Sequence, residues 1–348
     1  MKKTVRGIAI LFLTLLCYIG YIFYSTGYFR KIENSFAGTI ERKVALPGVE
    51  DIQISYEDGF MLFSSDDRAS RRDGNTEQGH LYYMDLTNTK FEPIKLTTDL
   101  KIPFYPHGIS MVRTADHVYR VYAINHVDSE HSIEVFNLHD DNLIHIRTLK
   151  DASMISPNDI VALDKERFYF TNDHGYTEGL GKLGEEYLGW AASNVVYYDG
   201  NGYREVAADI AYANGINLDR ERSLLFVASP RDFLVKVFHI KEHGNLDFIE
   251  DVDCGTGVDN IEFTPDGRLW IGCHPSLLAF TAYAKGKKPI SPSEIITIDY
   301  RAKGDYSTKI VFMDDGGNMS ASSVAAVYKD FIFVGNVMDD HFLILSKE

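Results

Sequence analysis

The sequence predicts an all-β fold, a six-bladed β-propeller with a central tunnel, preceded by an N-terminal hydrophobic signal-anchor helix. Three observations lead to this prediction. After residue 32 the chain consists of short runs of alternating apolar and polar residues, such as 51–56 and 118–124, with Gly, Asp and Asn turns between them. Many of the 21 Tyr and 21 Phe stand beside Val or Ile, which suits half-buried strands. A short phrase also recurs six times, which indicates repeated structural units.

The N-terminal segment is predicted to be a membrane anchor. Three basic residues precede Gly7–Phe29, a stretch of 23 residues without a charge. At about 1.5 Å per residue, such a helix crosses a hydrocarbon layer of about 30 Å with some tilt. The alternative is a cleaved signal peptide, whose apolar region is usually shorter and ends at a small-residue cleavage site. The only small cluster here is 25–27, so an uncleaved anchor is favoured.

Export of the rest of the chain follows from the charges around this segment. The basic residues before it favour an N-terminus on the inner side, with the propeller on the periplasmic, lumenal or extracellular side. If the segment were cleaved, the protein would be secreted. We therefore expect two regions, a signal anchor at 1–31 and a propeller domain at 32–348.

The repeated phrase divides the exported region into six units. It consists of two small or polar residues followed by Ile or Val, and its aliphatic positions are 45 to 63 residues apart. An average of about 54 residues accommodates the four short strands of one propeller blade. In a propeller, the phrase would open the innermost strand of each blade and face the central tunnel. The six phrases begin at Glu50, His107, Asn158, Asn214, Asp259 and Ser322.

This placement concentrates carboxylates on one axis. Four carboxylates would converge there with three amides, and no phrase contains Lys or Arg. Buried ionised carboxylates repel one another and lose their hydration, so two divalent cations are expected to neutralise them. A ligand set of oxygen atoms alone favours calcium over zinc. The alternative is that these residues only make turns at strand starts. The residues concerned are Glu50, Asp51, Asp159, Asp259, Asn158, Asn214 and Asn260.

Composition excludes several other classes of protein. The formal net charge of −15 argues against a nucleic-acid-binding protein, which would need a basic face. With only three cysteines, the chain is neither a disulfide-stapled scaffold nor a cysteine-rich zinc module.

Seven stretches of the chain resemble the serum paraoxonase/arylesterase family, whose members are calcium-dependent lactonases with six-bladed propellers. They occur in family order between about residue 45 and residue 340, nearly the whole exported region. The stretches are Pro106–Ser110, Asn125–Asp128, Asn158–Ala162, Thr171–His174, Ala213–Asn217, Val258–Ile261 and Leu269–Pro275.

The resemblance implies roles for particular residues. It implies a catalytic calcium held by Glu50, Asn158, Asn214, Asp259 and Asn260. It likewise implies a deeper, structural calcium held by Asp51, Asp159 and the carbonyl of Ile109. His107 and His126 would form a dyad, in which His107 takes a proton from water and His126 tunes it. Imidazole titrates near neutrality, which suits this task, and calcium would polarise the ester carbonyl. Family substrate-pocket positions are matched by Arg68, His174, Tyr212, His274, Val337 and Met338.

Two features depart from the family pattern. Vertebrate members join their chain ends by a disulfide, whereas this chain has no cysteine between residues 18 and 253 or after 273, so closure is expected to depend on strand pairing. The segment that corresponds to the family's mobile lid, 66–78, is far more polar than a cover for apolar substrates would be. Organophosphate activity is therefore not expected to follow from the resemblance.

The function that these expectations favour is calcium-dependent hydrolysis of carboxylic esters. Lactones are the expected substrates, with aryl esters as a side activity. Two alternatives stay open: a calcium-stabilised propeller that binds without catalysis, and a propeller with one metal that hydrolyses sugar lactones.

Overall fold

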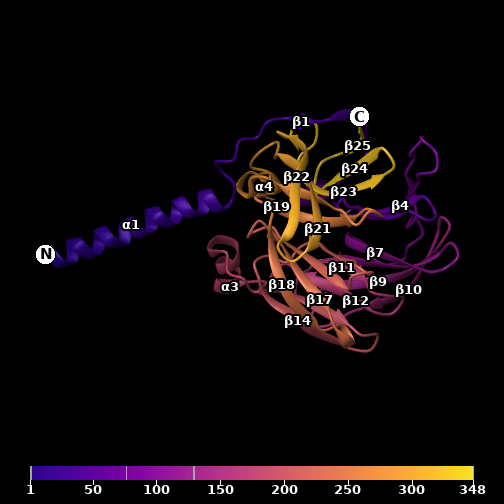
Figure 1. Cartoon of the computed structure of the whole chain (residues 1–348), viewed down its shortest axis with the longest axis horizontal. Helices are drawn as coiled ribbons and strands as arrows, with labels where there is room; N and C mark the ends of the chain where they lie inside the picture. Colours follow the sequence, from indigo (N-terminus) through magenta and orange to yellow (C-terminus); the bar gives the residue numbers. More distant parts are fainter. Residues whose placement is uncertain (1, 76, 128–129, 348) are drawn as a thin grey trace.

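The computed structural model describes residues 2–75, 77–127 and 130–347 and has the architecture of a six-bladed β-propeller. Six antiparallel sheets surround a central axis, and a long N-terminal helix projects away from them (Figure 1). The apolar side chains form clusters between neighbouring sheets, as the alternating pattern of the sequence predicts.

Each blade contains four strands that follow one another from the axis outward. The innermost strands are β3 (Ile52–Ser55), β7 (Pro106–Ala115), β11 (Pro157–Ala162), β15 (Ile216–Asp219), β19 (Gly257–Phe263) and β23 (Ser322–Tyr328). The second strands are β4 (Phe60–Ser65), β8 (Val118–Val127), β12 (Phe168–Asn172), β16 (Leu224–Ser229), β20 (Leu269–His274) and β24 (Phe331–Asn336). The third strands are β5 (His80–Asp85), β9 (Glu130–His139), β13 (Ser193–Tyr198), β17 (Leu234–Ile240), β21 (Ser293–Ala302) and β25 (Phe342–Lys347). The outer strands are β6 (Ile94–Lys95), β10 (Asn142–Leu149), β14 (Tyr203–Ile210), β18 (Leu246–Asp253), β22 (Asp305–Asp314) and β2 (Gly38–Val44).

The long N-terminal helix, several short helical segments and one extra strand complete the fold. They are α1 (Lys2–Ser25), α2 (Arg68–Arg72), α3 (Gly179–Leu183), η1 (Gly184–Leu188), η2 (Glu242–Gly244), α4 (Leu277–Ala284) and β1 (Ser35–Phe36), which pairs with β22.

The six repeated phrases lie at or immediately before the starts of the innermost strands, as the sequence predicts. At several of them the pairing with the second strand is irregular, for example between Pro157 and Ile160 and between Val258 and Ile261. In a regular strand, successive side chains point to opposite faces. A bulge changes this direction locally and is a common device next to active sites. Such a bulge allows the side chains of two consecutive polar residues in one phrase to face the central axis.

Glycine occupies the middle of two phrases because neighbouring inner strands approach closely there. A Cβ atom on Gly108 would lie 2.6 Å from the Cα of Asp159. On Gly215 it would lie 2.3 Å from the backbone oxygen of Asp259. No side chain fits at either place, so the tight tunnel itself requires glycine.

The propeller is closed by strand pairing. The N-terminal strand β2 is the outer strand of the sixth blade and pairs antiparallel with β25, near the C-terminus. Its partners run from Gly38 opposite Lys347 to Val44 opposite Phe342. Both ends of the chain thus contribute to one blade, in agreement with the expectation from the cysteine positions.

Helix α1 contains an apolar span, Lys3–Ser25, whose most apolar stretch has a mean hydropathy of 2.1 and no residue buried within the protein. By length and composition it could cross a membrane. The segment that follows it is attached to the propeller by an ion pair: Arg30 Nη1 donates to Glu294 Oε2 at 2.7 Å, and its second nitrogen pairs with Oε1. The Glu294 side chain is fully buried.

We expect Arg30→Ala to lower the unfolding free energy by about 3 kcal/mol, because it leaves the Glu294 carboxylate buried without its cation. Thermal unfolding of the full chain in detergent measures this. Lys31→Ala is the matched control, since that side chain is 80% exposed and should change little. Equal melting temperatures for the two variants would show that the ion pair does not stabilise the propeller.

Candidate metal and catalytic site

The residues proposed to hold the first calcium come together at the floor of one pocket. Four of them, Glu50, Asn158, Asn214 and Asp259, line the same hollow of about 390 Å³. The fifth, Asn260, donates from Nδ2 to Oε1 of Glu50 at 3.1 Å. All five side chains are buried, although they come from four different blades.

Each of these five side chains also has a buried oxygen without a hydrogen-bond partner. These atoms are Oε2 of Glu50, Oδ1 of Asn158, Oδ1 of Asn214, Oδ1 of Asp259 and Oδ1 of Asn260. A buried acceptor that lacks a donor costs about 1–3 kcal/mol, so a native fold rarely collects five in one place. Carboxylate and amide oxygens are the ligands that calcium prefers. The arrangement therefore fits a hard divalent cation.

Asp51 and Asp159 lie in a different environment, where each carboxylate oxygen accepts a hydrogen bond from a backbone N–H group. Asp51 accepts from the N–H of Ile52 at 2.8 Å and from that of Ile109 at 2.7 Å. Asp159 accepts in the same way from Ile160 and Ile216, each at 2.7 Å. Each aspartate thus bonds within its own blade and to the next one, and ties neighbouring inner strands together.

A fifth carboxylate on the axis, Glu262, escaped the sequence analysis. It is buried, and Gln53 and Asn217 donate to its Oε1. Burial raises its pKa well above the usual range, and the charge of Asp159 adds to the effect. Burial likewise raises the pKa of Asp51 and of Asp159, with further contributions from neighbouring carboxylates. Glu262 stands two residues after Asn260 on a buried inner strand, and this spacing was its only signal in the sequence.

These raised pKa values predict that chelator-treated protein loses stability as the pH increases. The folded chain binds more protons than the unfolded chain above about pH 4, where free carboxyls ionise, so the unfolding free energy falls from there until the raised pKa values are passed. Melting temperatures of the calcium-free protein at about pH 5 and about pH 8 should show this decrease. Glu262→Gln should make it smaller. A melting temperature that rises with pH would contradict the prediction.

His107 and His126 form a hydrogen-bonded pair at the rim of the floor. Nδ1 of His107 lies 2.9 Å from Nε2 of His126, while Nε2 of His107 lies 3.2 Å from Oε1 of Glu50. Burial lowers the pKa of His126 well below its usual value, and the neighbouring histidines lower it further. The pair therefore joins a neutral, buried imidazole to one that faces the pocket. A third imidazole, His131, lies 2.8 Å from His126, Nδ1 to Nδ1, and was not among the sequence predictions.

Two further side chains complete the walls near the floor. Nε2 of His274 lies 2.9 Å from Oδ2 of Asp259, and its ring stacks on Phe280 with centroids 3.8 Å apart. Asp173 accepts from Asn158 at 3.3 Å and pairs with Nδ1 of His174 at 2.7 Å. Burial opposes ionisation of Asp173, but the bond from His174 prevails and lowers its pKa. The sequence motif that contains Asp173 was recognised without a role for this residue.

The residues expected to touch substrate are only partly brought together. His174, Tyr212, His274 and Val337 line the pocket above the floor. Arg68 lies in α2 beside this pocket, with Nη2 3.9 Å from Oε2 of Glu50 and Nη1 3.5 Å from the carbonyl of Val337. Met338 lines a separate hollow with Arg72 and Tyr283. The end of α1 reaches the pocket through Ile22, and Thr26, the residue that follows the helix, lines it as well.

Comparison with known proteins gives a consistent result. The sequence model of the arylesterase family matches residues 73–343. Serum paraoxonase/arylesterase 1 of Homo sapiens is 31% identical over 268 residues, which cover 76% of this chain and 73% of the human protein. The same protein of Mus musculus is 30% identical over 300 residues and 83% of each chain. Among solved structures, a luciferin-regenerating enzyme matches with a TM-score of 0.55 and 10% identity, over 88% of this chain and 92% of the other, which shows the fold alone.

Proposed function

Because the chain belongs to the paraoxonase/arylesterase family, a family of hydrolases, we propose that it is a calcium-dependent hydrolase of carboxylic esters. Lactones are its main substrates in this proposal, and aryl esters are a side activity. The observation that carries the proposal is the group of five buried, unpartnered oxygens at the pocket floor, next to the imidazole pair.

The five side chains with unpartnered oxygens would hold the catalytic calcium: Glu50, Asn158, Asn214, Asp259 and Asn260. Bound there, calcium would polarise the ester carbonyl and stabilise the oxyanion that forms on it. A second, structural calcium would be held by Asp51, Asp159 and the carbonyl of Ile109. The unfavourable burial of those two aspartates, seen in their raised pKa values, supports a neutralising cation at this place.

His107 would act as the general base. Its Nε2 atom faces the pocket floor, and its Nδ1 atom is fixed by His126, so the ring is held in one orientation toward the reacting water. Glu50 would also orient His107, through the contact at 3.2 Å. His126 lies behind His107 and tunes it through the bond between their rings.

The pocket above the floor suits an uncharged, largely apolar substrate. Leu277, Leu278, Phe280 and Trp190 contribute to its wall, together with the end of α1. A neutral lactone is not repelled by the acidic protein. We further propose that α1 anchors the protein in a membrane, with the propeller on the exported side, where calcium is abundant.

The experiment that tests this function follows acid release by the full-length protein in detergent. The panel contains aliphatic lactones, sugar lactones and phenyl acetate, each with calcium and with EDTA. We expect calcium-dependent turnover, fastest with aliphatic lactones. Folded, calcium-loaded protein that hydrolyses none of these substrates would contradict the proposal and favour a binding role. Preference for sugar lactones would favour the alternative with one metal.

A further inference from the structure

Three histidines form a continuous line of hydrogen bonds in the second blade. His107 Nδ1 lies 2.9 Å from His126 Nε2, and His126 Nδ1 lies 2.8 Å from His131 Nδ1. The ring centroids are 5.0 and 4.8 Å apart. His126 and His131 stand directly opposite each other on β8 and β9, so the strand register fixes their contact. Both nitrogens of the central ring are therefore used within the line.

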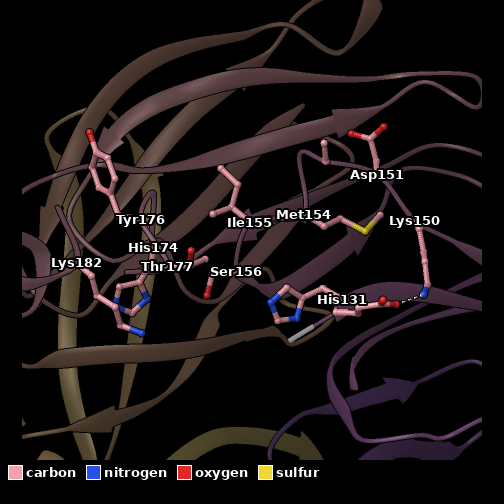
Figure 2. A pocket seen from close by; sticks show the side chains of 12 residues that line it. His131, Lys150, Asp151, Met154, Ile155, Ser156, His174, Tyr176, Thr177 and Lys182 are labelled. Atoms are coloured by element: carbon pink, nitrogen blue, oxygen red, sulfur yellow. Dashed lines mark hydrogen bonds and ion pairs between the residues drawn. The ribbon is translucent and has the colours of Figure 1, made fainter. Parts of the chain in front are cut away.

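The outer end of the line opens into a second cleft. His131 lines a hollow of about 780 Å³ that shares only His174 with the substrate pocket. Figure 2 shows the His131 ring among the side chains that line this cleft. Nε2 of His131 has no hydrogen-bond partner among the described residues. The line thus connects the reaction centre with solvent by a route that bypasses the substrate.

We propose that His131 is the outer station of a proton path that runs from His107 through His126 to this cleft. The inference rests on the proposed function, because it concerns the proton that ester hydrolysis sets in motion. Imidazole suits such a path, since one ring nitrogen can accept a proton while the other releases one.

The path balances the reaction in two movements. When water attacks the carbonyl carbon, its oxygen forms the new C–O bond and its proton passes to Nε2 of His107. The proton on Nδ1 of His107 moves to Nε2 of His126, and the proton on Nδ1 of His126 moves to Nδ1 of His131. His131 then releases the proton on its Nε2 atom into the cleft. The reverse movement then delivers a proton to the leaving alkoxide as its C–O bond breaks. The acid product ionises, so one carboxylate, one hydroxyl group and one proton leave.

Neighbouring rings meet nitrogen to nitrogen at both contacts, so the line can pass a proton outward and return one by the reverse movement. Buried His126 is a poor place for a charge, whereas His131 is only partly buried, so a path to the cleft spares the interior a lasting imidazolium.

The test measures kcat of the full-length protein for an aliphatic lactone at low and high concentrations of imidazole buffer. His131→Ala removes the outer station and leaves space, so we expect kcat to fall by about tenfold at low buffer and to recover as imidazole replaces the side chain. His131→Phe should show the same loss without recovery, because the ring fills the space. His139→Ala lies on the same strand, outside the line, and should behave like the wild type.

Different outcomes separate this inference from the proposed function. A wild-type protein without turnover contradicts the proposed function itself. Unchanged kcat in both His131 variants, or an equal loss that imidazole does not relieve, overturns the proton path. If neither variant folds, the dependence of the wild-type rate on deuterium content decides. A curved plot of the rate against the deuterium fraction of the solvent indicates that several protons move in the same step, and it supports the path. A straight plot indicates one moving proton and overturns the path.

Discussion

His107→Gln is expected to lower kcat for lactone hydrolysis by about 10²- to 10³-fold, while the bound calcium stays in place. Glutamine can still donate to Oε1 of Glu50, so the pocket floor should keep its geometry, but it cannot accept a proton from water. Steady-state kinetics together with the calcium content of the purified variant measure both parts of this expectation.

His139→Gln provides the control for this substitution, because its side chain is 64% exposed and lies outside the pocket. It should retain wild-type activity. If His107→Gln kept more than about a third of the wild-type kcat, His107 would not be the base in the sense of general base catalysis. If the variant lost its calcium, the role of His107 would be to support the metal site.

Removal of calcium should abolish activity and lower the melting temperature by about 10 °C or more. A ligand present at 1,000 times its Kd stabilises a fold by about 4 kcal/mol, so two such ions contribute about 8 kcal/mol. Each kcal/mol shifts the melting temperature of a chain of this length by about 1–2 °C. The physical reason is that Glu50, Asp51, Asp159, Asp259 and Glu262 share one buried axis.

Calorimetry with EDTA, and after addition of excess calcium, measures this effect. Magnesium should restore little of it, because magnesium requires octahedral geometry and keeps its water. Asp259→Asn should reduce the effect of calcium, since it removes one ligand charge. A melting temperature that does not respond to EDTA would mean that the carboxylates of the axis do not bind a stabilising ion.

Much of the fold could be predicted because its central feature is local in sequence. The six phrases mark the innermost strands directly, and their even spacing gives the number of blades. The outer strand of the sixth blade could not be predicted in this way. Strand β2 carries mostly exposed side chains, and its pairing with β25 joins residues about 300 positions apart. No periodic pattern within either strand specifies such a distant partner.

The candidate site was predictable where side chains belong to a phrase. The five side chains proposed for the first calcium are gathered by the phrases themselves. Pocket walls are harder to predict, because adjacent residues of an extended chain point to opposite sides. Val337 and Met338 show this alternation, because Val337 lines the pocket while its neighbour Met338 lines another hollow.

Residues that act through contacts between elements were missed. The role of His131 depends on the register of the β8–β9 hairpin, which places it opposite His126. The partnership of Arg30 with Glu294 depends on where α1 ends relative to the fifth blade. Such contacts join residues that no single motif contains.

The most direct test of the account is the number of calcium ions bound per chain. The full-length protein is dialysed against trace calcium, and metal analysis is performed on the wild type, Asn214→Ala and Asp159→Asn. We predict two calcium ions in the wild type. Asn214→Ala should weaken the binding of the catalytic calcium, and Asp159→Asn should weaken the binding of the structural calcium. A wild-type protein that binds no calcium, or full and equally tight binding in both variants, would contradict the assignment of the site.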